Sequence, residues 1–190
     1  MTGTACGRCQ HTPPPFRRCI AAVDYGFPWD RLVARFKFQQ QAELAGLLAG
    51  VLFDAVQQAQ HAPVDAVLPV PLSDARLAER GYNQAWELAR RIAAKLGPPA
   101  HADWLLRLRD TPHQVGLHRQ DRERNLRAVR DALWVPPAAA IALAGRHLAL
   151  VDDVMTTGST ATAASQALLA AGAASVQVWV LARTPEPSVG

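Results

Sequence analysis

Short runs of continuous apolar residues alternate along this chain with longer segments in which apolar residues recur at helical spacing. The continuous runs are typical of strands buried on both faces of a sheet, and they occupy residues 20–25, 64–70, 147–151 and 175–182. The helical spacing predicts helices over residues 40–59, 84–96 and 160–171. Because strands alternate with amphipathic helices, the sequence predicts an α/β fold with a mainly parallel sheet flanked by helices.

Composition narrows the class of protein. The chain has 190 residues, of which 49% are hydrophobic and 19% charged, so it is too apolar for a disordered protein and can bury a sizeable core. No stretch approaches the ~18 consecutive apolar residues of a membrane span, and the N-terminus lacks the apolar run of a secretory signal. Three cysteines, an odd number, argue against a disulfide framework. These features predict a cytoplasmic protein.

The basic residues are nearly all arginine, and they are unevenly distributed. Of 20 basic residues only Lys37 and Lys95 are lysine, and seven arginines fall between Arg107 and Arg130 against three acids. A segment of this kind suits a polyanionic ligand, either nucleic acid or a phosphorylated small molecule. A solvated helix face with alternating charges, as in RQDRERNLRAVRD, fits the same pattern, and composition does not choose between them.

The segment LALVDDVMTTGST carries the clearest chemical signal. An apolar strand ends in Asp152 and Asp153, and a loop of Thr, Gly and Ser then opens a helix. Ligands of parallel sheets bind past the carboxyl ends of the strands, where inward-turned amides and a helix N-terminus can hold one phosphate. Gly158 has the conformational freedom to curl this loop.

The same segment lacks the Gly-Lys-Ser/Thr of a nucleoside-triphosphate loop, so it predicts a cradle for a monophosphate. The two carboxylates suit the hydroxyls of a sugar and a hydrated Mg²⁺. The ordinary alternative is a strand, turn and helix in which Ser159 or Thr160 is the N-cap.

Four segments together resemble a known family. VDDVMTTGST resembles the phosphoribosyl-pyrophosphate (PRPP) signature of type I phosphoribosyltransferases. Three others resemble one branch of these proteins, the ComF family with its GntX-like members: DYGFPWDRLVARFKF, VLPVPLSDARLAERGYNQAWELA (with Tyr82 in place of the usual Phe) and RLRDTPHQVGLHRQDRERNLRAV. The resemblance runs from about residue 6 to residue 184, and it implies the type I phosphoribosyltransferase fold with a small hood.

The resemblance also implies roles for individual residues. Asp152 and Asp153 would contact the ribose hydroxyls and help to hold Mg²⁺, and the 5-phosphate loop would comprise Thr156, Thr157, Gly158, Ser159 and Thr160. The pyrophosphate loop would run from Pro71 to Arg76, and the residues assigned to it are Pro71, Leu72, Ser73, Arg76 and Arg80. A mobile hood over residues 107–127 would contribute Arg107, Arg109, Thr111, Gln114 and Arg119. The alternatives are exposed helix arginines for Arg76 and Arg80, and a surface loop for the hood.

The N-terminal segment contains half of a zinc-ribbon ligand set. We divide the chain into a Cys-rich remnant (1–19), a phosphoribosyltransferase-like domain (20–184) and a tail (185–190). Cys6 and Cys9 form one CxxC pair, and Cys19 does not complete a site of standard zinc spacing. The sequence therefore predicts no structural zinc.

Two classes of function follow. The first is a Mg²⁺-dependent enzyme that transfers phosphoribosyl from PRPP to an acceptor that the sequence does not specify. The second is a non-catalytic protein that binds PRPP or single-stranded DNA in competence and DNA uptake. Few aromatic residues interrupt the arginine-rich segment, which only Trp104 and Trp134 flank, and this weakens the nucleic-acid hypothesis. Expected partners are PRPP, single-stranded DNA or a competence-machinery protein, and a second copy in a homodimer.

Overall fold

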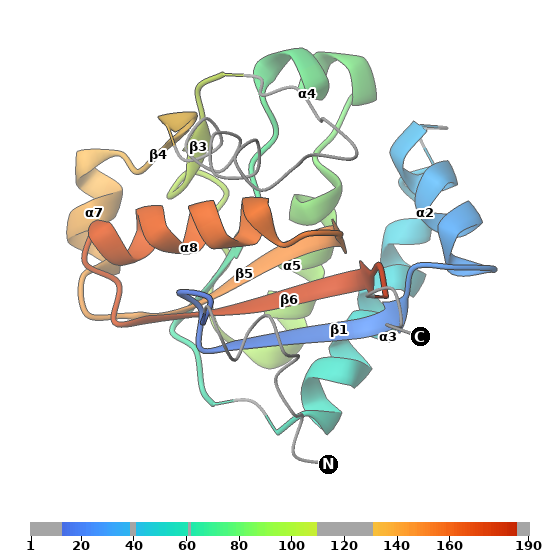
Figure 1. The fold of residues 1–190 in the computed structure, drawn as a ribbon, viewed down its shortest axis with the longest axis horizontal. Helices are drawn as coiled ribbons and strands as arrows, with labels where there is room; N and C mark the ends of the chain where they lie inside the picture. The colour runs from blue at the N-terminus through green and yellow to red at the C-terminus, as the bar shows by residue number, and fades with distance from the viewer. Residues whose placement is uncertain (1–12, 39–40, 61, 110–130, 186–190) are drawn as a thin grey trace.

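A parallel sheet of four strands forms the centre of the molecule. The computed structural model describes residues 13–38, 41–60, 62–109 and 131–185. Its main sheet has the order β1-β6-β5-β2, with all neighbours parallel (Figure 1): β1 Arg18–Asp24, β6 Ser175–Arg183, β5 His147–Met155 and β2 Ala66–Pro69. The predicted α/β class with a mainly parallel sheet is confirmed.

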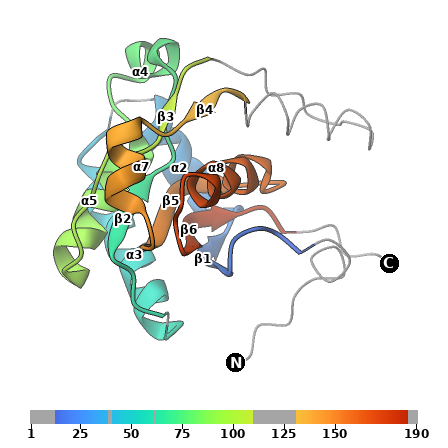
Figure 2. The ribbon, with the colours of Figure 1, turned by 90° about the vertical axis from the view of Figure 1, so that its left-hand side faces the viewer.

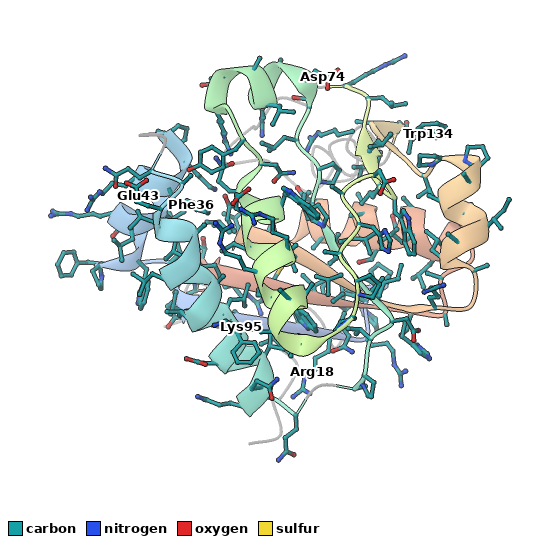
Figure 3. The ribbon with its side chains drawn as sticks, turned by 180° about the vertical axis from the view of Figure 1, so that it is seen from behind. Arg18, Phe36, Glu43, Asp74, Lys95 and Trp134 are labelled. Atoms are coloured by element: carbon teal, nitrogen blue, oxygen red, sulfur yellow. The ribbon has the colours of Figure 1, made fainter. Side chains whose placement is uncertain are left out.

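Helices cover both faces of this sheet, as an all-parallel sheet requires. One face carries α2 (Trp29–Phe38), α3 (Leu44–Gln58) and α5 (Gln84–Leu96), and the other carries α7 (Pro137–Leu143) and α8 (Ser159–Ala170). Figure 2 shows the sheet between these layers, with α3 and α5 on one side and α8 on the other. Figure 3 shows the first face from behind, where Lys95 reaches across from α5 and lies 4.9 Å from the ring centre of Phe53 on α3.

The central strands explain why the core forms here. Every residue of β6 except the last is buried, and all of these buried residues are apolar except Ser175 and Gln177. The largest buried side chain, Trp179, points from β6 into the α2, α3 and α5 layer. Its neighbours along the strand, Val178 and Val180, face the α7 and α8 layer.

Most predicted elements are confirmed with small shifts at their ends. The predicted helix over 84–96 has the bounds of α5, because Asn83 accepts a hydrogen bond from the Trp86 amide as N-cap and Gly97 ends the helix with φ of 104°. The predicted helices over 40–59 and 160–171 are α3 and α8, and β1 begins two residues before the predicted strand at 20.

One predicted boundary is wrong. The strand expected to end at Val151 continues as β5 through both aspartates to Met155. The reason is nonlocal, because β6 offers backbone partners along this whole length, up to the pair Met155 and Arg183. Hydrophobicity alone places the end of the strand at the first carboxylate.

A second prediction is also incomplete. Of the stretch Pro71–Arg76, the first three residues form a loop. Ser73 is the N-cap of α4 (Asp74–Arg80), so the rest of the stretch is helical. The sequence predictions further missed α7 and a small antiparallel pair, β3 (Leu106–Arg107) with β4 (Leu133–Trp134). Across the described ranges, no helix combines the length and apolar character needed to cross a bilayer.

Candidate functional site

The candidate site lies where the parallel strands end. The short strand β2 stops at Pro69, opposite Val151, and the Val70 amide still donates to the Val151 carbonyl at 2.8 Å. Residues 152–155 of β5 therefore extend past β2 and are paired only with β6. Figure 1 shows α2 and the start of α8 close to this end of the sheet. The carboxyl edge of such sheets is where ligands bind, and the two aspartates lie on it.

The two carboxylates point to different faces of the sheet, since they are adjacent residues of one strand. Asp153 is 6% exposed, and its Oδ1 lies 2.9 Å from Nζ of Lys37, at the end of α2. Asp152 is half-buried and accepts a 2.9 Å hydrogen bond from the Asp153 amide. Each carboxylate therefore has its own local environment.

Asp152 has an unusual protonation equilibrium. Burial raises the pKa of its carboxyl group from 3.8 to about 7, and the negative charge of Asp153 acts in the same direction. The positive charges of Lys37 and Arg107 and the hydrogen bond from the Asp153 amide oppose this rise of the pKa but do not cancel it. The raised pKa therefore comes mainly from burial of this carboxyl group, with the neighbouring carboxylate of Asp153 adding to it.

The loop after β5 turns at a glycine and leads directly into α8. Gly158 is the N-cap of α8 with φ of 77°, a left-handed conformation that favours glycine. The alternative in which Ser159 or Thr160 serves as N-cap is not observed, and the Ser159 amide donates to Oγ1 of Thr157 at 3.4 Å. Thr157 Oγ1 lies 2.9 Å from Ser159 Oγ, and Thr156 and Thr157 are exposed. The loop therefore presents hydroxyls beside the amides of the first helical turn.

The residues assigned to a pyrophosphate loop are divided between a loop and a helix. Pro71, Leu72 and Ser73 follow β2, whereas Arg76 lies in the first turn of α4 and Arg80 at its end. Arg76 and Arg80 therefore lie on a helix, as in the alternative given for them, but both are half-buried and not fully exposed.

The junction between α4 and α5 is tied to the sheet edge. Nδ2 of Asn83 donates to the Val70 carbonyl at 3.1 Å. Nη1 of Arg80 donates to Oε1 of Gln84 at 3.1 Å, and the guanidinium lies 5.3 Å from the ring centre of Phe38. Nε of Arg80 and Nε2 of Gln84 are buried without a hydrogen-bond partner of standard geometry. Buried donors without such a partner are uncommon in folded proteins.

Only part of the predicted hood can be located. Arg107 is 9% exposed on β3, and its Nε donates to the Arg109 carbonyl at 3.3 Å, so it is not a surface-loop residue. Its positive charge acts on Asp152, which places it near the candidate site. Arg109 is exposed. Thr111, Gln114 and Arg119 lie outside the described residues.

The three cysteines of the incomplete zinc ligand set are similarly divided. Cys6 and Cys9 lie outside the described residues, and Cys19 is on β1 with its Sγ 3.9 Å from Sδ of Met155. Among the residues that the structure describes, no group of three or more His, Cys, Asp or Glu side chains could hold a metal ion.

Sequence reasoning assigned no role to the end of α2 or to Gln84. Lys37 and Phe38 belong to the segment DYGFPWDRLVARFKF, which carried the family resemblance, and Lys37 is one of only two lysines. The rarity of lysine in this sequence was the one local feature that could have drawn attention to Lys37. The contacts of Lys37 with Asp153 and of Phe38 with Arg80 join segments far apart in the sequence, and local patterns do not report such contacts.

Relatives of this chain carry competence and DNA-utilization names. The chain is 40% identical over 184 residues to DNA utilization protein YhgH of Salmonella typhi, covering 94% of this chain and 78% of that protein. It is 35% identical over 187 residues to competence protein F of Haemophilus influenzae, with the same coverage. The chain belongs to the ComF family. The family indicated by the four sequence segments is thereby confirmed, although no family model matches.

Further comparisons of this ComF-family chain are more distant. It is 29% identical over 153 residues to competence protein ComFC of Bacillus subtilis, covering 80% of this chain and 58% of that protein. A PRPP amidotransferase of B. subtilis aligns with a TM-score of 0.44 and 20% identity over 74% of this chain and 26% of that chain. An adenine phosphoribosyltransferase of Thermoanaerobacter pseudethanolicus aligns with a TM-score of 0.44 and 12% identity, covering 77% and 83% of the two chains. Structural likeness at this level supports no conclusion about function.

Proposed function

We propose that this ComF-family protein binds PRPP with Mg²⁺ at the carboxyl end of β5 and transfers the phosphoribosyl group to an acceptor. One observation carries the proposal. Two aspartates extend past the neighbouring strand β2, and a turn with Gly158 in a left-handed conformation then leads into α8. Carboxylates that accept sugar hydroxyls, followed by a monophosphate cradle, are what a ribose 5-phosphate group requires.

The residues present fit a Mg²⁺ ion that the substrate shares. Mg²⁺ keeps several waters and is held in proteins through one or two carboxylates together with substrate phosphates. Asp152 and Asp153 place one carboxylate on each face of β5, and one carboxylate together with substrate phosphates is enough to hold this ion. When bound, Mg²⁺ would neutralise charge on the departing pyrophosphate.

The protein's own residues would position the sugar and stabilise charge. As pyrophosphate leaves the anomeric carbon, positive charge grows on the ribose ring and negative charge grows on the leaving group. Asp152 and Asp153 would hold the ribose hydroxyls and sit near the positive ring, and Arg80 and Arg107 would attract the leaving phosphates. The loop over Thr156–Thr160 would fix the 5-phosphate, so that the anomeric carbon is held in one place.

Calorimetric titration with PRPP and Mg²⁺ tests this proposal. Wild-type protein should bind, and the double variant Asp152→Asn with Asp153→Asn should bind at least 100-fold more weakly, which corresponds to about 3 kcal/mol. The matched control is Asp54→Asn with Asp103→Asn, which removes the same charge from two exposed positions outside the site and should leave binding unchanged. Equal affinity of the site variant and wild type, or no binding by wild type at millimolar ligand, would refute the proposal. Release of pyrophosphate in an acceptor screen then tests catalysis.

A second candidate function is binding of single-stranded DNA, and one observation favours it. Exposed aromatic side chains gather around α2: Tyr25 is 37% exposed, Phe27 77% and Phe38 65%. Arginines stack on two of them, with Arg31 5.3 Å from the Phe27 ring centre and Arg80 5.3 Å from that of Phe38. Aromatic rings interleaved with arginine are typical of surfaces that stack nucleic-acid bases.

Fluorescence anisotropy with a labelled oligonucleotide tests this second function. If the surface binds DNA, affinity should fall steeply with salt, and Phe27→Ser should weaken it about tenfold. Ile141→Ser, at an equally exposed apolar position on α7, is the control and should have no effect. Absence of salt-dependent binding would rule this function out for the chain.

A further inference from the structure

The last turn of α2 contacts both halves of the candidate site. Its three final residues are consecutive, and each has a different partner. The Phe36 carbonyl accepts a hydrogen bond from the Tyr82 hydroxyl, Lys37 pairs with Asp153, and Phe38 stacks with Arg80. One short turn therefore connects the acid of the ribose pair to the arginine assigned to the pyrophosphate.

The turn itself is held firmly. Phe36 is fully buried in the core, where Figure 3 shows it on α2, and its ring centre lies 5.7 Å from that of Tyr82. Burial raises the pKa of the Tyr82 hydroxyl, while the nearby Gln84 side chain acts against that rise, so this group remains a neutral donor to the Phe36 carbonyl. The backbone from which Lys37 and Phe38 project is therefore anchored to the core and to Tyr82.

Lys37 supplies the positive charge that Asp153 needs. The two side chains are 19% and 9% exposed, so water screens their 2.9 Å contact only weakly. With Lys37 on Oδ1, the carboxyl group of Asp153 is held in one orientation, and its second oxygen can accept a hydrogen bond from a ligand hydroxyl.

Phe38 supplies a surface that orients Arg80. No carboxylate within the described ranges pairs with Arg80, and its Nε is buried without an acceptor. Among the described residues, its guanidinium contacts Oε1 of Gln84 and the Phe38 ring. An arginine that is oriented but short of acceptors is prepared for an anion.

We propose that Lys37 and Phe38 are positioning residues of the ligand site: Lys37 holds Asp153 for a ribose hydroxyl, and Phe38 holds Arg80 for a diphosphate. The inference rests on the proposed PRPP function and extends it to two residues with no assigned role. It implies that each residue affects a different part of the same ligand, although they are neighbours in the chain.

Four variants test the inference by their affinity for PRPP with Mg²⁺. Lys37→Met and Phe38→Leu keep the size and apolar stem of each side chain, and each should weaken binding about tenfold. Lys37→Arg keeps the positive charge, and Phe38→Tyr keeps the ring, so both should stay within about threefold of wild type. A purely structural role would not follow charge and aromaticity in this way.

Two partial ligands then separate the two roles. In NMR titrations at about 0.15 M salt, Lys37→Met should weaken ribose 5-phosphate about tenfold and inorganic pyrophosphate less than threefold. Phe38→Leu should show the reverse pattern. Equal losses for both ligands in both variants would overturn the inference, as would wild-type PRPP affinity in Lys37→Met and Phe38→Leu. If wild type itself does not bind PRPP, the proposed function fails, and the inference fails with it. The two failures are therefore distinguishable.

Discussion

Replacing Asp152 by asparagine should stabilise the protein at neutral pH while weakening its ligand site. The carboxyl group of Asp152 has a pKa raised to about 7 by burial and by Asp153, against an ordinary value of 3.8. The folded state therefore disfavours the charged form of this side chain. Asparagine has nearly the same shape and keeps an oxygen that can accept the hydrogen bond from the Asp153 amide, but it carries no charge.

The magnitude follows from linkage between protonation and folding. A raised pKa means that the folded state binds the proton more tightly than the unfolded state, so wild-type stability falls as pH rises from about 4 to about 7. About 3 pKa units at 1.36 kcal/mol each set an upper limit of about 4 kcal/mol for the free energy involved. Asp152 is partly exposed, so water screens the charge, and we expect about 1–3 kcal/mol. The variant and wild type should be equally stable below pH 4 and should differ by this full amount above pH 7.

Urea unfolding at pH 4, 6 and 8 measures this difference as a shift of the midpoint at constant slope. Asp153→Asn is the matched control. It also removes one charge of the pair, but it leaves Lys37 without its 2.9 Å partner, so it should not stabilise the protein at pH 8. A stability difference between Asp152→Asn and wild type that does not change with pH, or a less stable Asp152→Asn at pH 8, would refute the reasoning.

Three further predictions concern the phosphate loop, the hood and the cysteines. Gly158→Ala should cost about 1–2 kcal/mol of unfolding free energy and weaken PRPP binding, because the φ of Gly158 is 77°. The control Gly46→Ala lies inside α3, where an added Cβ meets no other atom, and should not destabilise the protein. Equal effects of the two variants would exclude backbone strain as the cause. Tryptic cuts between Arg107 and Arg124 should dominate in the free protein and should slow several-fold with PRPP and Mg²⁺. The first of these cuts should follow Arg109, because Arg107 is buried on β3. Unchanged cleavage rates at saturating ligand would reject a closing hood. Elemental analysis should find well under one zinc per chain, and a full equivalent that resists mild chelation would show that the ligand count from Cys6, Cys9 and Cys19 is wrong.

Local pattern was sufficient for much of the secondary structure. The sequence predicted α5 to the residue, since its apolar face, the Asn83 cap and the terminal Gly97 are all local signals. It also predicted the strands of the main sheet and the turn at Gly158, because buried runs and a glycine at a helix start are readable without the rest of the chain. The family resemblance came from the same kind of local information, in four segments.

The tertiary structure decided which residues meet. The strand order, the extension of β5 past β2 and the length over which β6 supports it depend on pairing between distant segments. The same holds for the contacts of Lys37 with Asp153 and of Phe38 with Arg80. Periodicity and capping report the conformation of one segment, since they arise from interactions within a few residues. The environment of a charge depends on what the folded chain brings around it, so the raised pKa of Asp152 has no counterpart in the local sequence.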